Sequence, residues 1–252
     1  MTLRALIFDV DGTLADTERD GHLVAFNAAF AEAGLGWHWD EALYGDLLQV
    51  AGGVERIVHY ARLYRHQPDG DELHALARRL HANKTRHYVE RVAAGAVGLR
   101  PGVARLIDEA RTAGLRLAIA TTTTRENVTA LLQATLGGDA LGWFEVIGSA
   151  QEVALKKPDP AVYTWVLQRL GLRPEAALAL EDSRNGLVAA TRAGLPCIVT
   201  PTPWSETEDL HEALVRLADL DHHPARPDRL VSLDDLRQWH AEAPVSGASA
   251  PP

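Results

Sequence analysis

Beyond residue 98 the chain alternates between short apolar runs and helical patterns, and this alternation restricts the fold more than any other feature. The apolar runs cover residues 115–120, 144–148, 176–180 and 195–200. Helical patterns of roughly 10–15 residues separate them. Strands that alternate with helices are typical of a parallel sheet with helices on both faces. We therefore expect an α/β fold built on a doubly wound parallel sheet.

A further apolar run, residues 5–8, ends abruptly at the segment 9–13, which reads Asp-Val-Asp-Gly-Thr. If the strand continues, Asp9 and Asp11 point to one face and Val10 to the other. Two carboxylates at a strand end can bind a divalent cation, and one of them can attack phosphorus while the other transfers protons. Asp-Gly is also a common turn pair, so this segment by itself leaves a solvated turn open.

Between the first strand and residue 96 the pattern is helical throughout, and no strand pattern interrupts it. We expect helices over residues 17–34, 40–50, 53–66 and 70–93, with Thr17 as a candidate cap for the first. This stretch therefore predicts an all-helical domain that is inserted after the first strand.

The resulting domain organisation has a catalytic core, an insert and a tail. We expect residues 1–15 and 96–242 to form the α/β core and residues 16–95 to form a helical cap. Residues 243–252 are small and rich in proline, so we expect them to be disordered.

Composition and charge exclude several classes of partner. A net charge of -9 and a pI near 5.6 argue against nucleic-acid binding. No apolar run approaches the roughly 18–20 residues that a membrane span needs. The first strand begins close to Met1, so we expect no secretory or transit peptide. The single cysteine, Cys197, excludes an internal disulfide and favours the cytoplasm. We expect a cytoplasmic monomer with no nucleic-acid or membrane partner.

Polar side chains suited to phosphate chemistry follow three of the later strands. Thr121 and the next amide, of Thr122, can bind phosphate oxygens. Lys157 can neutralise a phosphoryl group. Glu181 and Asp182 end an apolar strand, where carboxylates are costly unless they are paired or bind a metal. Because ligands bind outside the carboxyl ends of parallel strands, we expect these residues to converge with the two carboxylates of the first strand.

Each of these residues also has a purely structural explanation. Thr121 could cap the next helix, and Lys157 could be a solvated loop lysine. One of the acids Glu181 and Asp182 could cap the helix that follows Ser183. The expected convergence of four clusters on one sheet edge favours the catalytic interpretation.

The set of strand ends resembles a known family. The resemblance covers roughly residues 3–200 and is to the haloacid dehalogenase-like (HAD) hydrolases, whose core is Rossmann-like and whose helical insert is a cap. The segments that resemble the four family motifs, in order, are Asp9-Val10-Asp11-Gly12-Thr13, the strand ending at Thr121, Lys157-Pro158-Asp159-Pro160 and Glu181-Asp182-Ser183.

The resemblance implies a Mg²⁺-dependent phosphatase. Asp9 would attack phosphorus to form an aspartyl phosphate, and Asp11 would transfer protons. Thr121 and Lys157 complete the implied catalytic set and, with the Thr122 amide, hold the phosphoryl group. The implied metal residues are Asp9, Asp11 through its carbonyl, Asp182, and Glu181, which orients metal-bound waters.

Residues 16–22 and 51–56 of the helical insert resemble a branch of the family that removes a phosphate from xylulose 1,5-bisphosphate, an inhibitor of the carbon-fixing enzyme Rubisco. The implied substrate is a small sugar bisphosphate and the implied role is support of the Calvin cycle. The insert residues expected to contact substrate are Glu18, His22, Tyr44, Gly52, Gly53, Arg56 and Lys84.

These insert residues have structural alternatives as well. Arg56 and Lys84, the candidates for the uncleaved phosphate, could be solvated helix charges. His22 and Tyr44, the candidates for sugar hydroxyls, could simply pack in the interior of the insert.

Other functions use similar residues. A sugar phosphomutase shares the core, but related mutases carry a histidine at the position of Gly21, and His22 lies one residue later, which favours hydrolysis. A non-catalytic phosphometabolite sensor would not need the complete catalytic set. A haloacid dehalogenase would leave Asp11 and Asp182 without a role. A phosphatase of another small phosphometabolite remains a further alternative.

Overall fold

The computed structural model describes residues 2–243, which form two compact units. The α/β unit comprises Met1–Leu14, Leu99–Thr121 and Gly142–Pro252. The helical unit comprises Ala15–Gly98 and Thr122–Leu141. Except for Ala243, the predicted disordered tail lies outside the described residues. Within residues 2–243, no helix has both the length and the apolar character that a membrane span requires.

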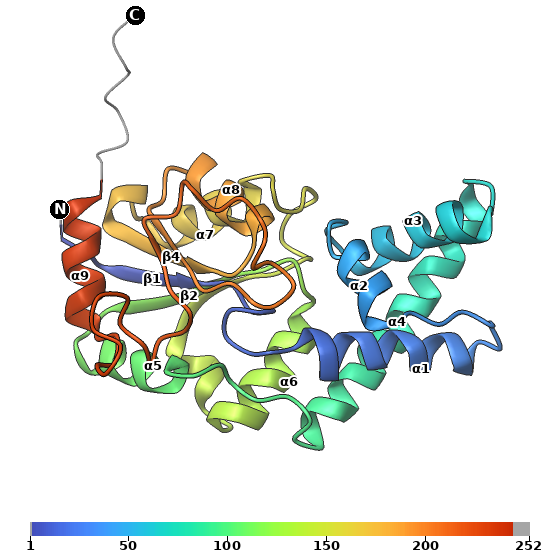
Figure 1. Ribbon diagram of the computed structural model, residues 1–252, viewed down its shortest axis with the longest axis horizontal. Helices are drawn as coiled ribbons and strands as arrows, with labels where there is room; N and C mark the ends of the chain where they lie inside the picture. Colours follow the sequence, from blue (N-terminus) through green and yellow to red (C-terminus); the bar gives the residue numbers. More distant parts are fainter. Residues whose placement is uncertain (1, 244–252) are drawn as a thin grey trace, which may run out of the picture. The chain divides into compact units, whose positions relative to one another are not determined.

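A six-stranded sheet forms the centre of the α/β unit (Figure 1). Its strand order is β3-β2-β1-β4-β5-β6, and every pair is parallel. In the middle of the sheet, Ile7 pairs with Ala118 on one side and Ala179 on the other. This confirms the predicted doubly wound parallel sheet. The strands are β1 (Ala5–Phe8), β2 (Arg116–Ala120), β3 (Phe144–Gly148), β4 (Ala177–Glu181), β5 (Cys197–Val199) and β6 (Val215–Arg216).

Helices cover both faces of this sheet, which is why its central strand β1 is apolar and buried along its whole length. Figure 1 shows α7 and α8 on one face and α5 on the other. The Leu233 N–H of α9 donates to Glu109 of α5 over 2.9 Å. The helices of the unit are α5 (Val103–Thr112), α7 (Ala161–Leu170), α8 (Arg184–Arg192) and α9 (Leu233–Glu242), with a 3₁₀ turn at Pro174–Ala176. A second 3₁₀ turn, Ala140–Trp143, contains the residues at which the chain passes from the helical unit to the α/β unit.

The sequence patterns described above do not predict β6 or α9. β6 is only two residues long and is not fully buried, so it carries no apolar run. The start of α9 could have been predicted, because Ser232 and Asp235 form a capping box at its first turn.

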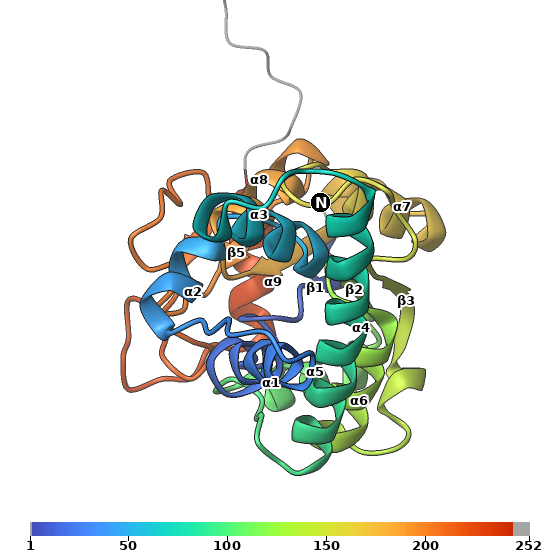
Figure 2. The ribbon, with the colours of Figure 1, turned by 90° about the vertical axis from the view of Figure 1, so that its right-hand side faces the viewer.

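The helical unit has the helices that the sequence predicts, with ends that shift by a few residues. Figure 2 shows α1 beside α4, and the two helices pack on each other. α6, which follows β2 in the chain, also belongs to this unit. The predicted domain boundaries stay a prediction. The helices are a π-helical turn (Glu18–Leu23), α1 (Val24–Glu32), α2 (Glu41–Leu47), α3 (Gly53–Arg65), α4 (Asp71–Ala93) and α6 (Arg125–Leu136).

Aromatic rings fill the interior of the helical unit. The Phe26 and Trp39 rings lie 4.7 Å apart, and the Asn27 side chain holds both backbone groups of Trp39 through hydrogen bonds of 2.8 Å. Tyr44 and Tyr60 pack against the same Trp39 ring. This interior surrounds several of the residues that the sequence analysis expected to contact substrate.

The central strands predict a clear stability difference between two Leu→Ala substitutions. Leu178 in β4 is 0% exposed, whereas Leu230 is 48% exposed. Leu178→Ala should lower the free energy of unfolding by about 2–5 kcal/mol, because it removes buried methyl groups and leaves a cavity. Leu230→Ala should change it by less than about 0.5 kcal/mol. Urea unfolding monitored by circular dichroism measures both, and equal losses would contradict the burial of β4.

Candidate active site

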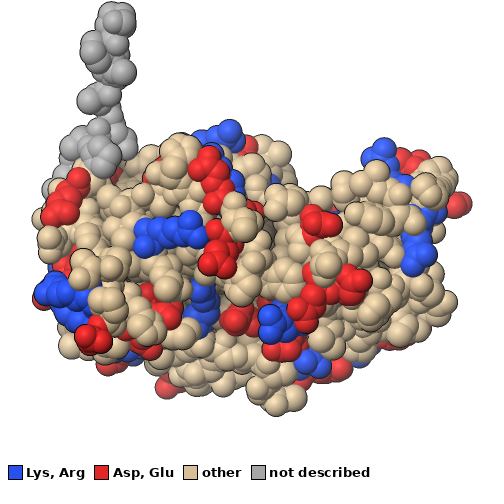
Figure 3. Space-filling view, in the orientation of Figure 1, with Lys and Arg blue, Asp and Glu red and all other residues tan. Residues whose placement is uncertain are grey.

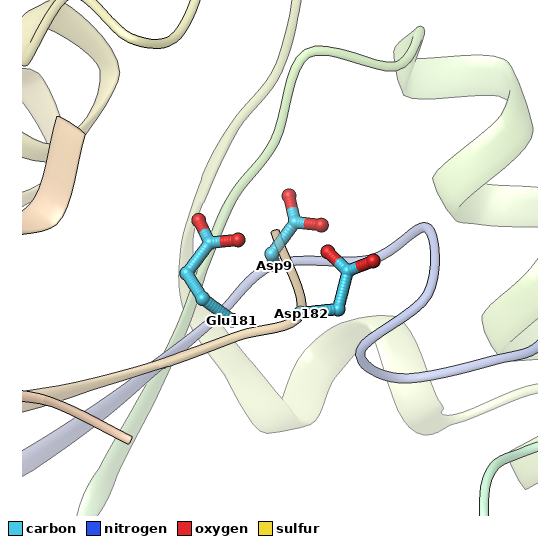
Figure 4. Close-up of side chains that lie close together, drawn as sticks. All are labelled: Asp9, Glu181 and Asp182. Carbon is cyan, nitrogen blue, oxygen red and sulfur yellow. The ribbon is translucent and has the colours of Figure 1, made fainter. Parts of the chain in front are cut away.

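Three buried carboxylates meet at the carboxyl ends of β1 and β4. Asp9, Glu181 and Asp182 each place an oxygen within 4.8 Å of the others. Figure 4 shows the three side chains on the same side of the two strand ends. Because β1 and β4 are neighbours in the sheet, residues distant in sequence come together here. The predicted convergence of Asp9 with Glu181 and Asp182 is therefore observed within one unit.

Lys157 joins two of these carboxylates. Its Nζ atom donates to Asp9 Oδ1 over 2.6 Å, to Glu181 Oε1 over 2.6 Å and to the Ala120 carbonyl over 2.8 Å. An ammonium group has three hydrogens, so these contacts use its full donor capacity. The side chain is 6% exposed, which makes the solvated-lysine alternative wrong. Burial lowers the pKa of Lys157, but Asp9 and Glu181 outweigh it and raise the pKa overall.

Negative charge exceeds positive charge in this cluster. Burial raises the pKa of Asp9, Lys157 lowers it, and Glu181 and Asp11 raise it further, to about 7 overall. One ammonium thus does not offset the neighbouring carboxylates. Closely spaced, oxygen-only donors are the ligands that hard divalent cations such as Mg²⁺ prefer. The donor set therefore fits a divalent metal, which would supply the missing positive charge.

Two residues that the sequence analysis did not select hold Glu181 in place. The Tyr163 hydroxyl on α7 donates to Glu181 Oε1 over 2.5 Å. A Cβ atom on Gly186 would lie 1.8 Å from Glu181 Oε2, so this position in α8 accommodates only glycine beside the carboxylate. A tyrosine on the buried face of a helix usually has a hydroxyl partner, and that signal could have identified Tyr163.

Asp182 packs against the turn after β1. A Cβ atom on Gly12 would lie 2.2 Å from Asp182 Oδ2, and the φ of Gly12 is 82°, which favours glycine for a second reason. Ser205 donates to the Asp182 carbonyl over 2.7 Å. The cap of α8 is Ser183, whose side chain accepts from the Gly186 N–H. The alternative in which an acid caps this helix is therefore wrong.

Asp11 and Thr121 also lie in the α/β unit. Asp11 is partly buried, and its charge contributes to the raised pKa of Asp9. Thr121 is buried, and its N–H donates to the Gly148 carbonyl over 3.0 Å. Thr124, not Thr121, caps α6. Thr122 belongs to the helical unit, so its contact with a phosphate stays a prediction.

In the helical unit, Arg56 lies within a network of polar groups. Its guanidinium donates to the Tyr44 hydroxyl over 3.2 Å and to the Leu47 and Val50 carbonyls over 3.1 and 3.3 Å. The Tyr44 hydroxyl in turn donates to Glu18. Tyr44 therefore has a polar role within the buried interior, and packing alone does not describe it.

A second buried cation, Lys84, lies beside His22. The two nitrogens are 2.7 Å apart, and the His22 ring stacks on Tyr88 with a centroid separation of 4.2 Å. Lys84 Nζ also lies 5.0 Å from the centre of the Phe26 ring. Figure 3 shows surface Lys and Arg side chains interspersed with Asp and Glu, whereas Arg56 and Lys84 are 9% and 4% exposed. The solvated-charge alternative is wrong for both.

The first turn of the helical unit is π-helical, so its hydrogen bonds differ from those of the α-helix that the sequence predicts. The His22 N–H donates to the Thr17 carbonyl, five residues earlier, over 2.8 Å. Thr17 has helical backbone angles and makes no side-chain cap, so the predicted capping role is wrong. A Cβ atom on Gly21 would lie 2.9 Å from the Tyr88 ring, which leaves no room for a larger side chain.

The two glycines at the start of α3 serve the packing of the unit. Gly52 has a φ of 96°, and a Cβ atom on Gly53 would lie 2.3 Å from the His81 ring of α4. The close approach of Gly53 to α4 and the positive φ of Gly52 explain why glycines stand here. Their predicted contact with a phosphate stays a prediction.

Comparisons with known proteins identify the family of this chain. The family model of the haloacid dehalogenase-like hydrolases matches residues 3–194. Protein CbbY of Cupriavidus necator is 54% identical over 247 residues, which cover 94% of this chain and 97% of that protein. A phosphorylated carbohydrates phosphatase of Thermotoga maritima is 30% identical over 193 residues, covering 77% of this chain and 82% of that protein.

A solved structure supports the same assignment. A mutant of CbbY from Rhodobacter sphaeroides in complex with xylulose-(1,5)bisphosphate has a TM-score of 0.83 and 43% identity, covering 93% of this chain and 99% of that chain. The resemblance found in the sequence is thus confirmed. The chain belongs to the haloacid dehalogenase-like hydrolase family and is a phosphatase related to the CbbY proteins.

Proposed function

We propose that this enzyme hydrolyses xylulose 1,5-bisphosphate to xylulose 5-phosphate and inorganic phosphate with Mg²⁺ as cofactor. The observation that carries the proposal is the buried cluster in which Lys157 holds Asp9 beside Glu181 and Asp182. The CbbY structure with xylulose-(1,5)bisphosphate supports the choice of sugar. Phosphate release from this sugar, measured with and without Mg²⁺, tests the proposal directly.

The first step forms an aspartyl phosphate. Lys157 donates to Asp9 Oδ1, so we assign the attack on phosphorus to Oδ2. As the new O–P bond forms, the bond from phosphorus to the sugar C1 oxygen breaks, and Asp11 donates a proton to that oxygen. Thr121 and Lys157 stabilise the charge that spreads over the phosphoryl oxygens.

The second step regenerates the enzyme. A water molecule attacks the phosphorus of the aspartyl phosphate while Asp11 accepts its proton. The bond between phosphorus and Asp9 breaks, which frees inorganic phosphate and restores the carboxylate. Asp11 thus acts first as an acid and then as a base, and it returns to its starting state after each turnover.

Asp9, Asp182 and the Asp11 carbonyl would hold the Mg²⁺, with Glu181 beside them. Its charge would offset both the carboxylates and the transferred phosphoryl group. Because Glu181 Oε1 already accepts from Lys157 and Tyr163, we assign Glu181 to orienting metal-bound waters. We assign Asp182 to holding the Mg²⁺ itself, because it places a carboxylate oxygen within 4.8 Å of oxygens of Asp9 and Glu181.

The helical unit supplies contacts to the part of the sugar that is not cleaved. We assign the 5-phosphate to Arg56 and Lys84, with the backbone at Gly52 and Gly53, because these are buried cations within one unit. We assign contacts with sugar hydroxyls to Glu18, His22 and Tyr44, whose polar groups form hydrogen bonds within this unit. A bisphosphate matches two separate cationic groups better than a monophosphate does.

A phosphomutase of the same family is the alternative, and the π-helical turn affects how it is judged. A π-helical turn contains one residue more than an α-helical turn, and His22 lies one residue after the position of the mutase histidine, so we do not use spacing alone to separate the two functions. The relatives favour hydrolysis. A mutase would move the phosphoryl group to another hydroxyl and release no inorganic phosphate. Calvin cycle support, a cytoplasmic location and a monomeric state belong to the same proposal.

Asp9→Asn should lower phosphatase activity at least about a thousandfold, because an amide cannot form the acyl phosphate. The matched control is Asp209→Asn, whose side chain is 68% exposed. Phosphate release from para-nitrophenyl phosphate and the melting temperature are measured for both. Substantial turnover by folded Asp9→Asn would refute the assignment of the nucleophile.

Chelation with EDTA should abolish activity, and added Mg²⁺ should restore it. Asp182→Asn should weaken Mg²⁺ binding about a hundredfold or more, since loss of an outer partner alone typically costs 10–100-fold. Isothermal titration calorimetry with MgCl₂ gives the affinity, with Asp234→Asn on the exposed face of α9 as the control. An unchanged affinity in Asp182→Asn would remove this residue from the metal site.

Arg56→Met and Lys84→Met should each lower kcat/KM for xylulose 1,5-bisphosphate by about tenfold to a hundredfold, because a charge-assisted contact is worth roughly 1.5–3 kcal/mol. Both should scarcely change kcat/KM for para-nitrophenyl phosphate, which has no second phosphate. Arg62→Met, on the exposed side of α3, is the control. An equal loss on both substrates would show that these cations support structure instead of recognition.

A further inference from the structure

Arg100 makes an unusual set of contacts at the edge of the α/β unit. Its guanidinium donates to oxygens in three separate segments, each of which follows a different strand. Its own N–H donates to the Leu14 carbonyl over 2.9 Å. The oxygens that accept from the guanidinium are those of Gly12, Thr200 (carbonyl, and Oγ1 at 3.1 Å), Pro201 (3.0 Å) and Ala218 (3.3 Å).

Two of these segments enclose Asp182. Gly12 lies so close to the carboxylate that a Cβ atom there would be 2.2 Å from Asp182 Oδ2. The same Cβ atom would lie 3.2 Å from the Thr202 methyl group, so the segment after Pro201 also packs against this turn. The Thr202 N–H donates to Ser205 Oγ over 3.0 Å, and Ser205 donates to the Asp182 carbonyl. Asp182 is therefore held between the two segments that Arg100 joins.

We propose that Arg100 is a positioning residue for Asp182, acting through the Gly12 turn and the segment that leads to Thr202. The inference rests on the proposed function, because it concerns the carboxylate assigned to Mg²⁺. A planar guanidinium can bind several carbonyl oxygens in one plane, which an ammonium cannot reproduce. Because no side chain separates Gly12 from the carboxylate, a shift of the turn transmits directly to Asp182.

Arg105 provides a matched control for a merely structural role. It is also a partly buried arginine of the α/β unit that donates to backbone carbonyls, those of Val231 and Leu220, over 2.8 and 2.7 Å. Its side-chain partners are Glu109, Val231, Leu220 and Asp221, which lie outside the Gly12 turn and the segment 200–205. Arg100→Met and Arg105→Met should therefore both lower the melting temperature, while only Arg100→Met should affect the metal site.

The experiment measures Mg²⁺ affinity by isothermal titration calorimetry for the wild type, Arg100→Met, Arg100→Lys and Arg105→Met. Arg100→Met should weaken Mg²⁺ binding about tenfold to a hundredfold, as loss of a residue that orients a metal ligand does. Its activity on para-nitrophenyl phosphate should fall at low Mg²⁺ and largely return at saturating Mg²⁺. Arg105→Met should keep the wild-type affinity to within about twofold.

Arg100→Lys keeps the positive charge and most of the aliphatic side chain but loses the guanidinium. It therefore tests whether the several N–H donors of the guanidinium are needed, even if Arg100→Met does not fold. It should also weaken Mg²⁺ binding, because one ammonium cannot serve oxygens in all three segments. Wild-type affinity in folded Arg100→Lys, or an equal loss in Arg105→Met, would overturn the inference. Absence of Mg²⁺-dependent phosphate release in the wild type would instead refute the proposed function, while the calorimetry would still report on Arg100.

Discussion

The three hydrogen bonds of the Lys157 ammonium are the interaction on which the catalytic edge depends. They reach Asp9 after β1, the Ala120 carbonyl at the end of β2 and Glu181 at the end of β4. These three strands are adjacent in the sheet, so one cation ties their ends together. Buried carboxylates are unfavourable unless they are paired and hydrogen-bonded. Without Lys157, Asp9 and Glu181 would repel each other at a spacing that the strand pairing imposes.

Two glycines allow the backbone to pack closely against the carboxylates of Glu181 and Asp182. Gly186 lets the first turn of α8 approach Glu181, and Gly12 lets the turn after β1 approach Asp182. Backbone atoms thus form one wall of the carboxylate cluster. Backbone atoms have no alternative rotamers, so they restrict the carboxylates more firmly than neighbouring side chains would. This arrangement suits a metal site, where ligand positions must hold to within a few tenths of an ångström.

The sequence was sufficient for five of the six strands and for the acidic cluster, because apolar runs, their spacing and the polar residues that end them are local features. It could not identify Arg100, whose partners lie far away in the chain and follow no period. The sequence also did not show whether Arg56 and Lys84 are solvated or buried, since the charge of a residue does not reveal whether its helix face is buried. The π-helical turn was missed for a related reason: its extra residue breaks the helical spacing on which the pattern depends. α9 had a capping signal and could have been found.

Lys157 and the pair Arg56 and Lys84 have different hydrogen-bond partners, and this difference affects how the proposed substrate would be selected. Lys157 is saturated by carboxylates and a carbonyl, whereas Arg56 and Lys84 are held by a tyrosine hydroxyl, backbone carbonyls, an imidazole and aromatic rings. The cost of removing Arg56 and Lys84 from water is already incurred when the helical unit folds. A phosphate that binds them gains charge-assisted hydrogen bonds without that cost, which is the advantage of a preorganised site. A monophosphate leaves both cations with the partners they already have and incurs no penalty. Discrimination in favour of a bisphosphate would therefore come from added attraction, and other substrates would be turned over slowly instead of being excluded.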